Sequence, residues 1–184
     1  MSEKYKVRNP DDHYFITFAV VGWVDVFTRH CYVDILLESI RFCQKEKGLE
    51  VYAWCIMSNH VHMIVGRNGN DDIPNIIRDL KKYTSKQIVK AIAENNKESR
   101  REWMMKLFLE YGYKSGKHMK NMFWQNEYHP VALFSQEMAM QKLNYIHRNP
   151  VVSGIVHEPS YYRYSSAGDY DSNRAGLLSI TFLY

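Results

Sequence analysis

The sequence predicts one α+β domain in which an antiparallel sheet is covered by helices. Two observations lead to this prediction: strand-like and helix-like stretches alternate along the chain, and 46% of its 184 residues are hydrophobic. A chain of this length is typical of one domain, and this hydrophobic content is sufficient for a packed core. We therefore treat residues 1–184 as a single domain with a tail after residue 150.

The first half of the chain predicts one strand, one helix and a hairpin. Residues 14–20 are aromatic and β-branched, which favours a strand. From about residue 29 to 47, hydrophobic side chains recur every three or four positions until Gly48, which is typical of an amphipathic helix with a glycine cap. Residues 50–57 and 60–65 are hydrophobic and are separated by two polar residues, which predicts a hairpin.

The second half predicts two further helices, one strand and an insertion. Acidic residues and a proline open a helix at residues 73–95. Residues 96–122 are basic and aromatic, which we interpret as an inserted helix and loop, and residues 123–134 contain a strand. A last helix over residues 135–149 begins with a serine cap and ends before Pro150. This order of elements is typical of a ferredoxin-like antiparallel sheet with its helices on one face.

Basic residues are concentrated in one part of the chain. The formal net charge is +4, and residues 97–120 alone hold seven basic and three acidic side chains. Basic side chains interleaved with aromatic ones suit a single-stranded nucleic acid, although an ordinary solvated surface has the same composition. Within the helix at 73–95, four basic positions share one face through their spacing. The positions predicted to contact nucleic acid are Arg78, Lys81, Lys82, Lys86, Arg100 and Arg101.

The cysteines and the hydrophobic runs predict a cytoplasmic protein without a membrane span. The three cysteines are an odd number, are widely spaced and lie in hydrophobic segments, which argues against a disulfide framework. The hydrophobic run at residues 18–24 is seven residues long even when Gly22 is counted, whereas a spanning helix needs about 18 residues or more. No hydrophobic leader follows Met1.

Two histidines in the second hairpin strand are candidate metal ligands. Side chains alternate along a strand, so His60 and His62 project from one face while Val61 points to the other. Two imidazoles at this spacing can share one divalent cation if a third ligand comes from elsewhere. Taken alone, the pair is a weak signal, and two polar side chains on a half-exposed strand are the alternative.

The last helix supplies a second candidate group. At about 100° per residue, Tyr145 and Asn149 leave the hydrophobic stripe of the helix and share another face. A phenol can act as a nucleophile there and an amide oxygen as a metal ligand. The alternative is a tyrosine packed at the flank of the helix, with Asn149 as a cap before Pro150. The predicted core stripe is Ala139, Met140, Leu143, Ile146 and His147.

Four sequence blocks occur in an order that matches a known family. They are residues 58–65 (SNHVHMIV), 123–125 (FWQ), 145–151 (YIHRNPV), and Gly154 with residues 164–166 (YSS). Together they resemble the single-tyrosine HUH transposases, in the branch of the REP-associated tyrosine transposases, which are related to small insertion-sequence transposases. The resemblance covers about residues 14–170 and implies a fold of the HUH endonuclease type.

The resemblance also implies a chemistry and the residues that perform it. His60 and His62 match the family's metal ligands, Asn149 matches its third ligand, and Tyr145 matches its nucleophile. The implied enzyme is a transposase that cuts and rejoins hairpin-forming single-stranded DNA through a 5′-phosphotyrosine, with Mg²⁺ or Mn²⁺ as cofactor and as a homodimer. Two alternatives stay open: a non-catalytic domain that binds single-stranded nucleic acid, and a nuclease of the replication-initiator type.

Overall fold

A four-stranded antiparallel sheet organises the chain. The computed structural model describes residues 9, 12–116, 121–126, 128–172 and 175–183. Its strands are β1 (Tyr14–Ala19), β2 (Leu49–Ile56), β3 (His60–Arg67) and β4 (Val131–Ala132), in the order β2-β3-β1-β4. All the pairings are antiparallel. This order is that of a ferredoxin-like sheet, so the predicted α+β class and sheet type are confirmed.

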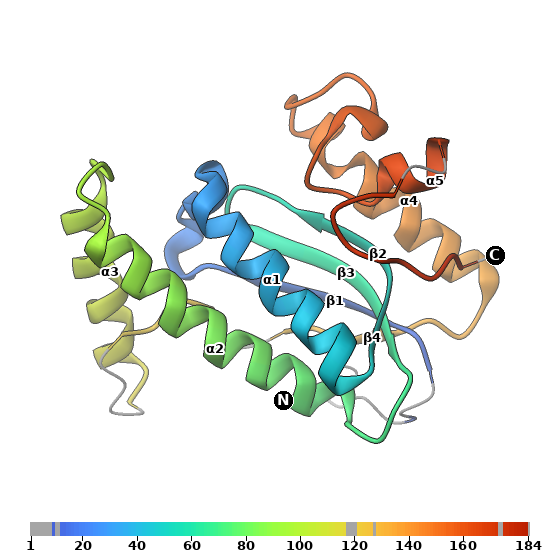
Figure 1. The fold of residues 1–184 in the computed structure, drawn as a ribbon, viewed down its shortest axis with the longest axis horizontal. Coiled ribbons are helices and arrows are strands. Elements are labelled where there is room, and N and C mark those ends of the chain that lie inside the picture. Colours follow the sequence, from blue (N-terminus) through green and yellow to red (C-terminus); the bar gives the residue numbers. More distant parts are fainter. Residues whose placement is uncertain (1–8, 10–11, 117–120, 127, 173–174, 184) are drawn as a thin grey trace.

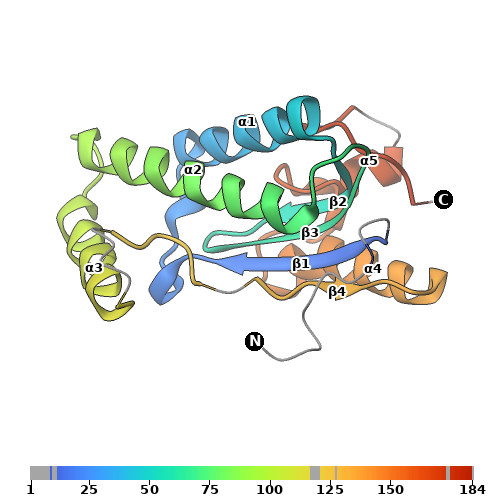
Figure 2. The ribbon, with the colours of Figure 1, turned by 90° about the horizontal axis from the view of Figure 1, so that it is seen from below.

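Helices cover both faces of this sheet. α1 (His30–Lys47) and α2 (Ile73–Glu94) lie on one face, as predicted, whereas α4 (Gln136–Val152) lies on the other (Figures 1 and 2). The expectation that the helices share one face therefore does not hold for α4. The reason is that β2 is buried on both sides along nearly its whole length, so each side needs a cover. Within the part of the chain that the structure describes, none of the helices combines the length and the hydrophobicity of a membrane span.

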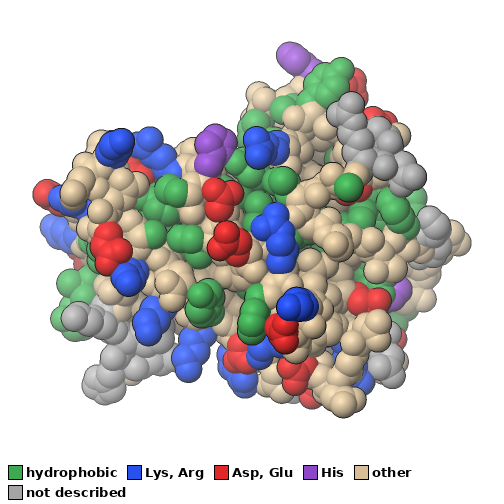
Figure 3. Space-filling view, viewed as in Figure 1, with side chains coloured by type: hydrophobic (Ala, Val, Ile, Leu, Met, Phe, Trp, Pro, Cys, Tyr) green, Lys and Arg blue, Asp and Glu red, His purple; other side chains and the backbone are tan. Residues whose placement is uncertain are grey.

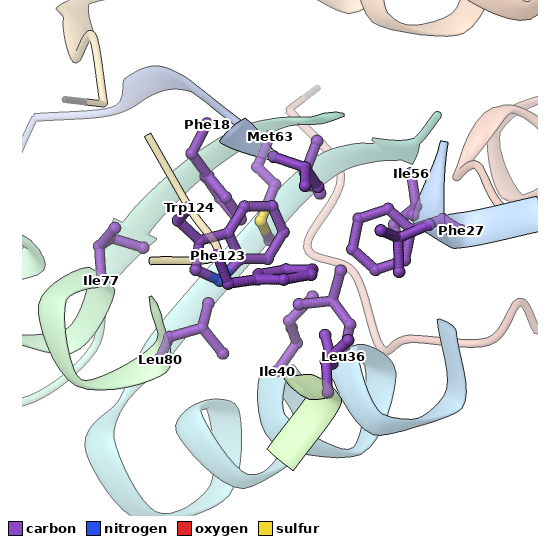
Figure 4. Packing of buried hydrophobic residues seen from close by; sticks show 14 of the residues in the cluster. Phe18, Phe27, Leu36, Ile40, Ile56, Met63, Ile77, Leu80, Phe123 and Trp124 are labelled. Atoms are coloured by element: carbon purple, nitrogen blue, oxygen red, sulfur yellow. The ribbon is translucent and has the colours of Figure 1, made fainter. Parts of the chain in front are cut away.

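The larger part of the core lies between the sheet and the pair α1 and α2. Phe123 and Trp124 fill its centre, between sheet residues and residues of the two helices (Figure 4). The Trp124 ring meets Phe18 edge-on at a centroid distance of 4.8 Å. Its indole Nε1 donates to Thr84 Oγ1 at 2.9 Å, which satisfies the one polar atom of a buried tryptophan. The predicted block at residues 123–125 is thus a structural anchor of the fold.

Capping residues in the sequence define some, but not all, of the termini of α1 and α4. α1 ends at Gly48 in the left-handed conformation (φ 67°), and Ser135 Oγ caps α4 by accepting from Met138 N at 3.2 Å. However, α4 does not end before Pro150 but continues to Val152 with the proline inside. Since Pro150 is buried, its packing offsets the backbone hydrogen bond that a proline removes.

The tail after α4 lies along the free edge of β2. It contains the short helices η4 (Pro159–Tyr161) and α5 (Ala167–Ser172). Backbone hydrogen bonds join Ile56 N to Tyr164 O at 2.8 Å and Thr181 N to Val51 O at 2.9 Å. The tail therefore covers an edge strand that would otherwise expose unpaired backbone groups.

The helix α3 (Arg101–Lys114) lies within the predicted insertion, of which residues 117–120 fall outside the described residues. Its N-terminal end is fastened to the loop before α1 through Glu98, whose side chain is fully buried. Arg29 and Arg100 both pair with this carboxylate, at 3.3 and 3.0 Å. Hydrogen bonds from Arg100 lower the pKa of Glu98 to about 2.

We predict that Glu98→Gln destabilises the protein by about 2 kcal/mol at neutral pH, because it removes hydrogen bonds between charged groups. The carboxylate has a lowered pKa in the folded state, so its contribution is present above about pH 4.5 and is lost as the pH falls toward 2. Urea unfolding followed by circular dichroism measures both effects. Equal stability of the variant and the wild type at pH 7 would show that α3 is not held by this network.

Candidate active site

The histidine pair lies on the sheet face that α4 covers. His60 and His62 project from the same side of β3, with ring centroids 4.6 Å apart. The residues between and after them, Val61 and Met63, belong to the core on the opposite face. The alternation expected for a strand thus places both imidazoles where they can act together.

The helix α4 places Tyr145 beside this pair. Its ring lies 5.2 Å from that of His62, and its side chain is 48% exposed. Phe15 of β1 contacts both rings, at 5.7 Å from His62 and 5.9 Å from Tyr145. A tyrosine that is open to solvent and fixed against a histidine is accessible to a large substrate.

The predicted stripe of α4 is correct except at one position. Ala139, Leu143, Ile146 and His147 are buried, whereas Met140 is 38% exposed. Asn149 follows Tyr145 by one helical turn and is partly buried. Its role as a metal ligand remains a prediction.

A hydrogen-bond chain fixes the orientation of His60. Its Nδ1 lies 2.6 Å from Asn59 Oδ1. The Asn59 amide nitrogen donates to Trp23 O at 3.2 Å and to Asp25 Oδ1 at 3.0 Å, so its oxygen must be the atom that faces His60. The proton of His60 is therefore on Nδ1, and the lone pair of Nε2 is available for a metal.

The surroundings of His62 also suit a metal ligand. Thr17, its cross-strand neighbour on β1, contacts Nδ1 at 2.7 Å. Nε2 is buried and has no hydrogen-bond partner among the described residues. A buried polar atom without a partner costs stability, and a bound cation would satisfy it. The two imidazoles consequently fit a divalent cation, although no cluster of three His, Cys, Asp or Glu side chains occurs in the described part of the chain.

Burial favours the neutral form of both imidazoles. It lowers the pKa of His60, against the opposing charge of Asp25. It lowers the pKa of His62 to about 3, with smaller contributions from the nearby charges of His60 and Lys142. Only a neutral imidazole offers a lone pair to a metal, so the two histidines on this face of the sheet suit a metal ion.

Lys142 brings a positive charge to the same place. Its Nζ lies 4.8 Å from the centre of the Phe15 ring and 5.7 Å from that of Tyr145. None of the carboxylates that the structure describes forms an ion pair with it. An ammonium beside an exposed tyrosine favours the approach of an anion.

Four of the predicted DNA-binding residues line one groove. The groove has a volume of about 860 Å³ and lies between α2 and residues 121–126 with Tyr128. Basic side chains border the outer edge of α2 in the space-filling view (Figure 3). Burial lowers the pKa of Lys81 to about 8, and its Nζ donates to Gln125 O at 2.8 Å. The lysines and arginines of the groove are Arg78, Lys81, Lys82, Lys86 and Lys90.

A family comparison covers the part of the chain that holds strands β1 to β3 and the histidine pair. The sequence model described as "Transposase IS200 like" matches residues 12–115, more than half of the chain. The chain belongs to the IS200-like transposase family. It is therefore a transposase, and the prediction that it is an enzyme of this kind is confirmed.

One solved structure resembles this IS200-like transposase in fold, and a second aligns more weakly. The structure of a REP-associated tyrosine transposase bound to a REP hairpin aligns with a TM-score of 0.66 at 19% identity, covering 100% of this chain and 94% of the other. A protein of Deinococcus radiodurans R1 assigned as a transposase aligns with a TM-score of 0.44 at 18% identity, covering 79% and 94%. No curated protein matches the sequence.

The remaining two predicted DNA contacts of the transposase lie elsewhere. Arg100 is bound to Glu98 and donates to Asp25 O at 2.8 Å, while Arg101 donates to Asn96 Oδ1 at 2.8 Å. The structure thus does not bring them to the groove, and it gives Arg100 a structural role. The net charge of a segment did not reveal this, because it does not distinguish paired from free arginines.

Sequence reasoning missed three residues of the site. Asn59 directly precedes His60, so its position beside the imidazole could have been predicted from the sequence. Lys142 precedes Tyr145 by three positions, which is one turn of a helix. Thr17 reaches His62 only through the register of β1 and β3, which no local pattern reveals.

We predict that His62 of the metal-free transposase stays neutral down to about pH 4.5, because its pKa is lowered to about 3. The unfolded chain takes up this proton below about pH 6.5, so His62 lowers the stability of the folded state as the pH falls from there toward 3. Ring chemical shifts followed by NMR test the assignment. A titration midpoint near the ordinary histidine value would contradict it.

Proposed function

We propose that this transposase cuts and rejoins single-stranded DNA through a covalent bond to Tyr145. His60, His62 and Asn149 hold a divalent cation, Mg²⁺ or Mn²⁺, beside the reacting phosphate. The observation that carries the proposal is the 5.2 Å separation of the Tyr145 and His62 rings, next to a buried Nε2 that lacks a partner among the described residues.

The donor set supports the cation. His60 and His62 present neutral nitrogens, and the hydrogen bonds at Nδ1 direct Nε2 of each ring toward a ligand. When bound, a divalent cation polarises a phosphate oxygen and orients the phosphodiester for in-line attack. Asn149 is the proposed third ligand because its amide oxygen lies one helical turn from the nucleophile.

The reaction at Tyr145 is a transesterification. The phenol loses its proton to water or a nearby base, and its Oη forms a bond to phosphorus while the bond from phosphorus to the 3′-oxygen breaks. The departing 3′-oxygen takes up a proton, which leaves a free 3′-hydroxyl and a 5′-phosphotyrosine. Lys142 supports this step, since its ammonium places positive charge beside the Tyr145 ring where the phosphate must approach.

The phosphotyrosine bond explains how strand transfer can follow without an external energy source. A second 3′-hydroxyl attacks the same phosphorus and displaces Tyr145, so one phosphodiester replaces another. This property separates a transferase from a simple nuclease, in which water would be the second nucleophile.

The DNA partner follows from charge and from the structural neighbour. The groove with Arg78, Lys82 and Lys86 supplies positive charge along α2 for a phosphate backbone. The neighbouring structure holds a REP hairpin, and we propose that this chain also recognises hairpin-forming single-stranded DNA, as a member of the REP-associated branch. The resemblance of the motifs further supports a homodimer acting in the cytoplasm, built from a single domain with an insertion at residues 96–122.

We predict that Tyr145→Phe abolishes the covalent adduct with single-stranded DNA from the flanks of the gene, because the variant lacks the attacking oxygen. Its fold and its DNA affinity should stay as in the wild type, since the ring is retained. Denaturing gels with labelled DNA measure the adduct, and mass spectrometry locates it.

The matched control is Asn149→Ala, which keeps the nucleophile and removes a proposed ligand. It should slow adduct formation and raise the Mg²⁺ concentration needed, by about tenfold or more. An adduct that persists in Tyr145→Phe and maps to another tyrosine would refute the assignment. If the wild type binds the DNA but forms no adduct, the chain is a non-catalytic binding domain.

We predict that replacing Lys82 and Lys86 by Gln weakens DNA binding and reduces the slope of log K against log salt by about 1.4, as expected for two lost contacts to a single strand. Fluorescence anisotropy at several salt concentrations measures this slope. Lys45→Gln serves as a control, because Lys45 is highly exposed on α1 and pairs with Glu46. An unchanged slope in the double variant would place the DNA on another surface.

A further inference from the structure

Trp23 is an exposed tryptophan at the edge of the candidate active site, held in an unusual backbone conformation. Its side chain is 58% exposed and its φ is 55°. Positive φ is rare for residues other than glycine, and it is least expected for a bulky side chain. Such a strained position persists only where its surroundings enforce it, and it often marks a functional site.

The loop that carries Trp23 is fastened on three sides. Backbone hydrogen bonds join Val20 N to Asn59 O at 2.8 Å and Val21 N to Phe123 O at 2.9 Å. Gly22 lies against α3, where an added Cβ would be 3.4 Å from the Leu107 side chain. The Asn59 side is held a second time, by the hydrogen bond from the Asn59 amide to Trp23 O.

These restraints connect Trp23 directly to the histidine pair. The amide of Asn59 binds Trp23 O through its nitrogen and faces His60 Nδ1 through its oxygen. The indole ring meets the His60 ring edge-on at a centroid distance of 5.8 Å. Its position is therefore fixed relative to the proposed metal ligands, with more than half of the side chain left open to solvent.

We propose that Trp23 is a stacking platform for an unpaired nucleobase of the DNA strand next to the phosphate at His60. This inference rests on the proposed function and adds a binding subsite to it. A rigid, exposed aromatic ring stacks any base, because every base has a π-face. Since the loop is already ordered, the stack forms without the entropic cost of fixing a mobile side chain.

The other tryptophans make the proposal specific. Trp54 and Trp124 are buried and cannot receive a base, whereas Trp103 on α3 is 54% exposed. Exposure alone therefore does not single out Trp23. Trp23 is singled out by its ring contact with His60 and by its enforced backbone conformation. Trp103 is an exposed tryptophan without these features and serves as the control.

The test uses Trp23→Gly in the full-length protein. Glycine accepts positive φ without strain, so a purely structural view of this position predicts an equal or higher melting temperature and unchanged DNA binding. We expect the melting temperature to be maintained or raised, and the affinity for single-stranded DNA from the gene flanks to fall by about tenfold. Anisotropy in EDTA measures binding without cleavage.

An abasic site moved one nucleotide at a time along the same oligonucleotide locates the stacked base. In the wild type and in Trp103→Ala, an abasic site at one position should weaken binding by about tenfold. This loss of affinity should be absent in Trp23→Gly. Trp23→Phe should retain part of it, because a smaller ring still stacks.

Wild-type affinity of Trp23→Gly would overturn the proposal, and so would the same abasic profile in that variant as in the wild type. A melting temperature that falls together with the affinity would instead assign Trp23 to the stability of the loop, and this also contradicts the proposal. Failure of the wild type to form the Tyr145 adduct in Mg²⁺ is a separate outcome, which refutes the catalytic function while the EDTA binding data still decide the subsite.

Discussion

The packing of α4 against the second face of the sheet is the constraint on which the candidate active site depends. Ala139, Leu143 and Ile146 lie in one core cluster with residues of β1, β2 and β3. These contacts fix the rotation of the helix, and the rotation decides that Tyr145 lies beside His62 and stays open to solvent.

A buried hydrogen bond also fixes the position of α4 relative to β2. His147 Nε2 lies 2.9 Å from Ser166 Oγ, and this hydroxyl also accepts from Trp54 N of β2 at 3.0 Å. Burial lowers the pKa of His147 to about 4, so the link is made by a neutral imidazole. Hydrophobic contacts and a hydrogen bond therefore fix the position of Tyr145 relative to the sheet. The hydrogen bond is made by His147, two residues after Tyr145 on the same helix.

The histidines depend on the loops and strands around them in the same manner. Asn59 forms a hydrogen bond with Nδ1 of His60, and Thr17 forms one with Nδ1 of His62. The orientations of both rings are therefore set before any ligand binds. Binding groups that are already oriented lose little entropy when the substrate arrives. The helix α3 adds to this support, because it contacts the loop of Gly22, and Arg100 at its N-terminal end donates to the backbone oxygen of Asp25.

Periodicity predicted the parts of this arrangement that are local. The alternation at His60 and His62 and the departure of Tyr145 from the stripe of its helix follow from strand and helix geometry alone. The prediction that all helices lie on one face of the sheet was wrong for α4, since the hydrophobic stripe of an amphipathic helix does not indicate which face of the sheet it covers. The contact of Thr17 with His62 and the pairing of Arg100 with Glu98 join residues far apart in the chain, and only the tertiary structure reveals them.

The central claim is that His60 and His62 hold a divalent cation beside Tyr145. Crystals grown with Mn²⁺ and measured at the manganese absorption edge test this claim most directly. The account predicts one anomalous peak within coordination distance of Nε2 of both histidines, and its loss in His62→Ala. A wild-type map without a peak between the two imidazoles, or with its strongest site elsewhere on the chain, would contradict the account.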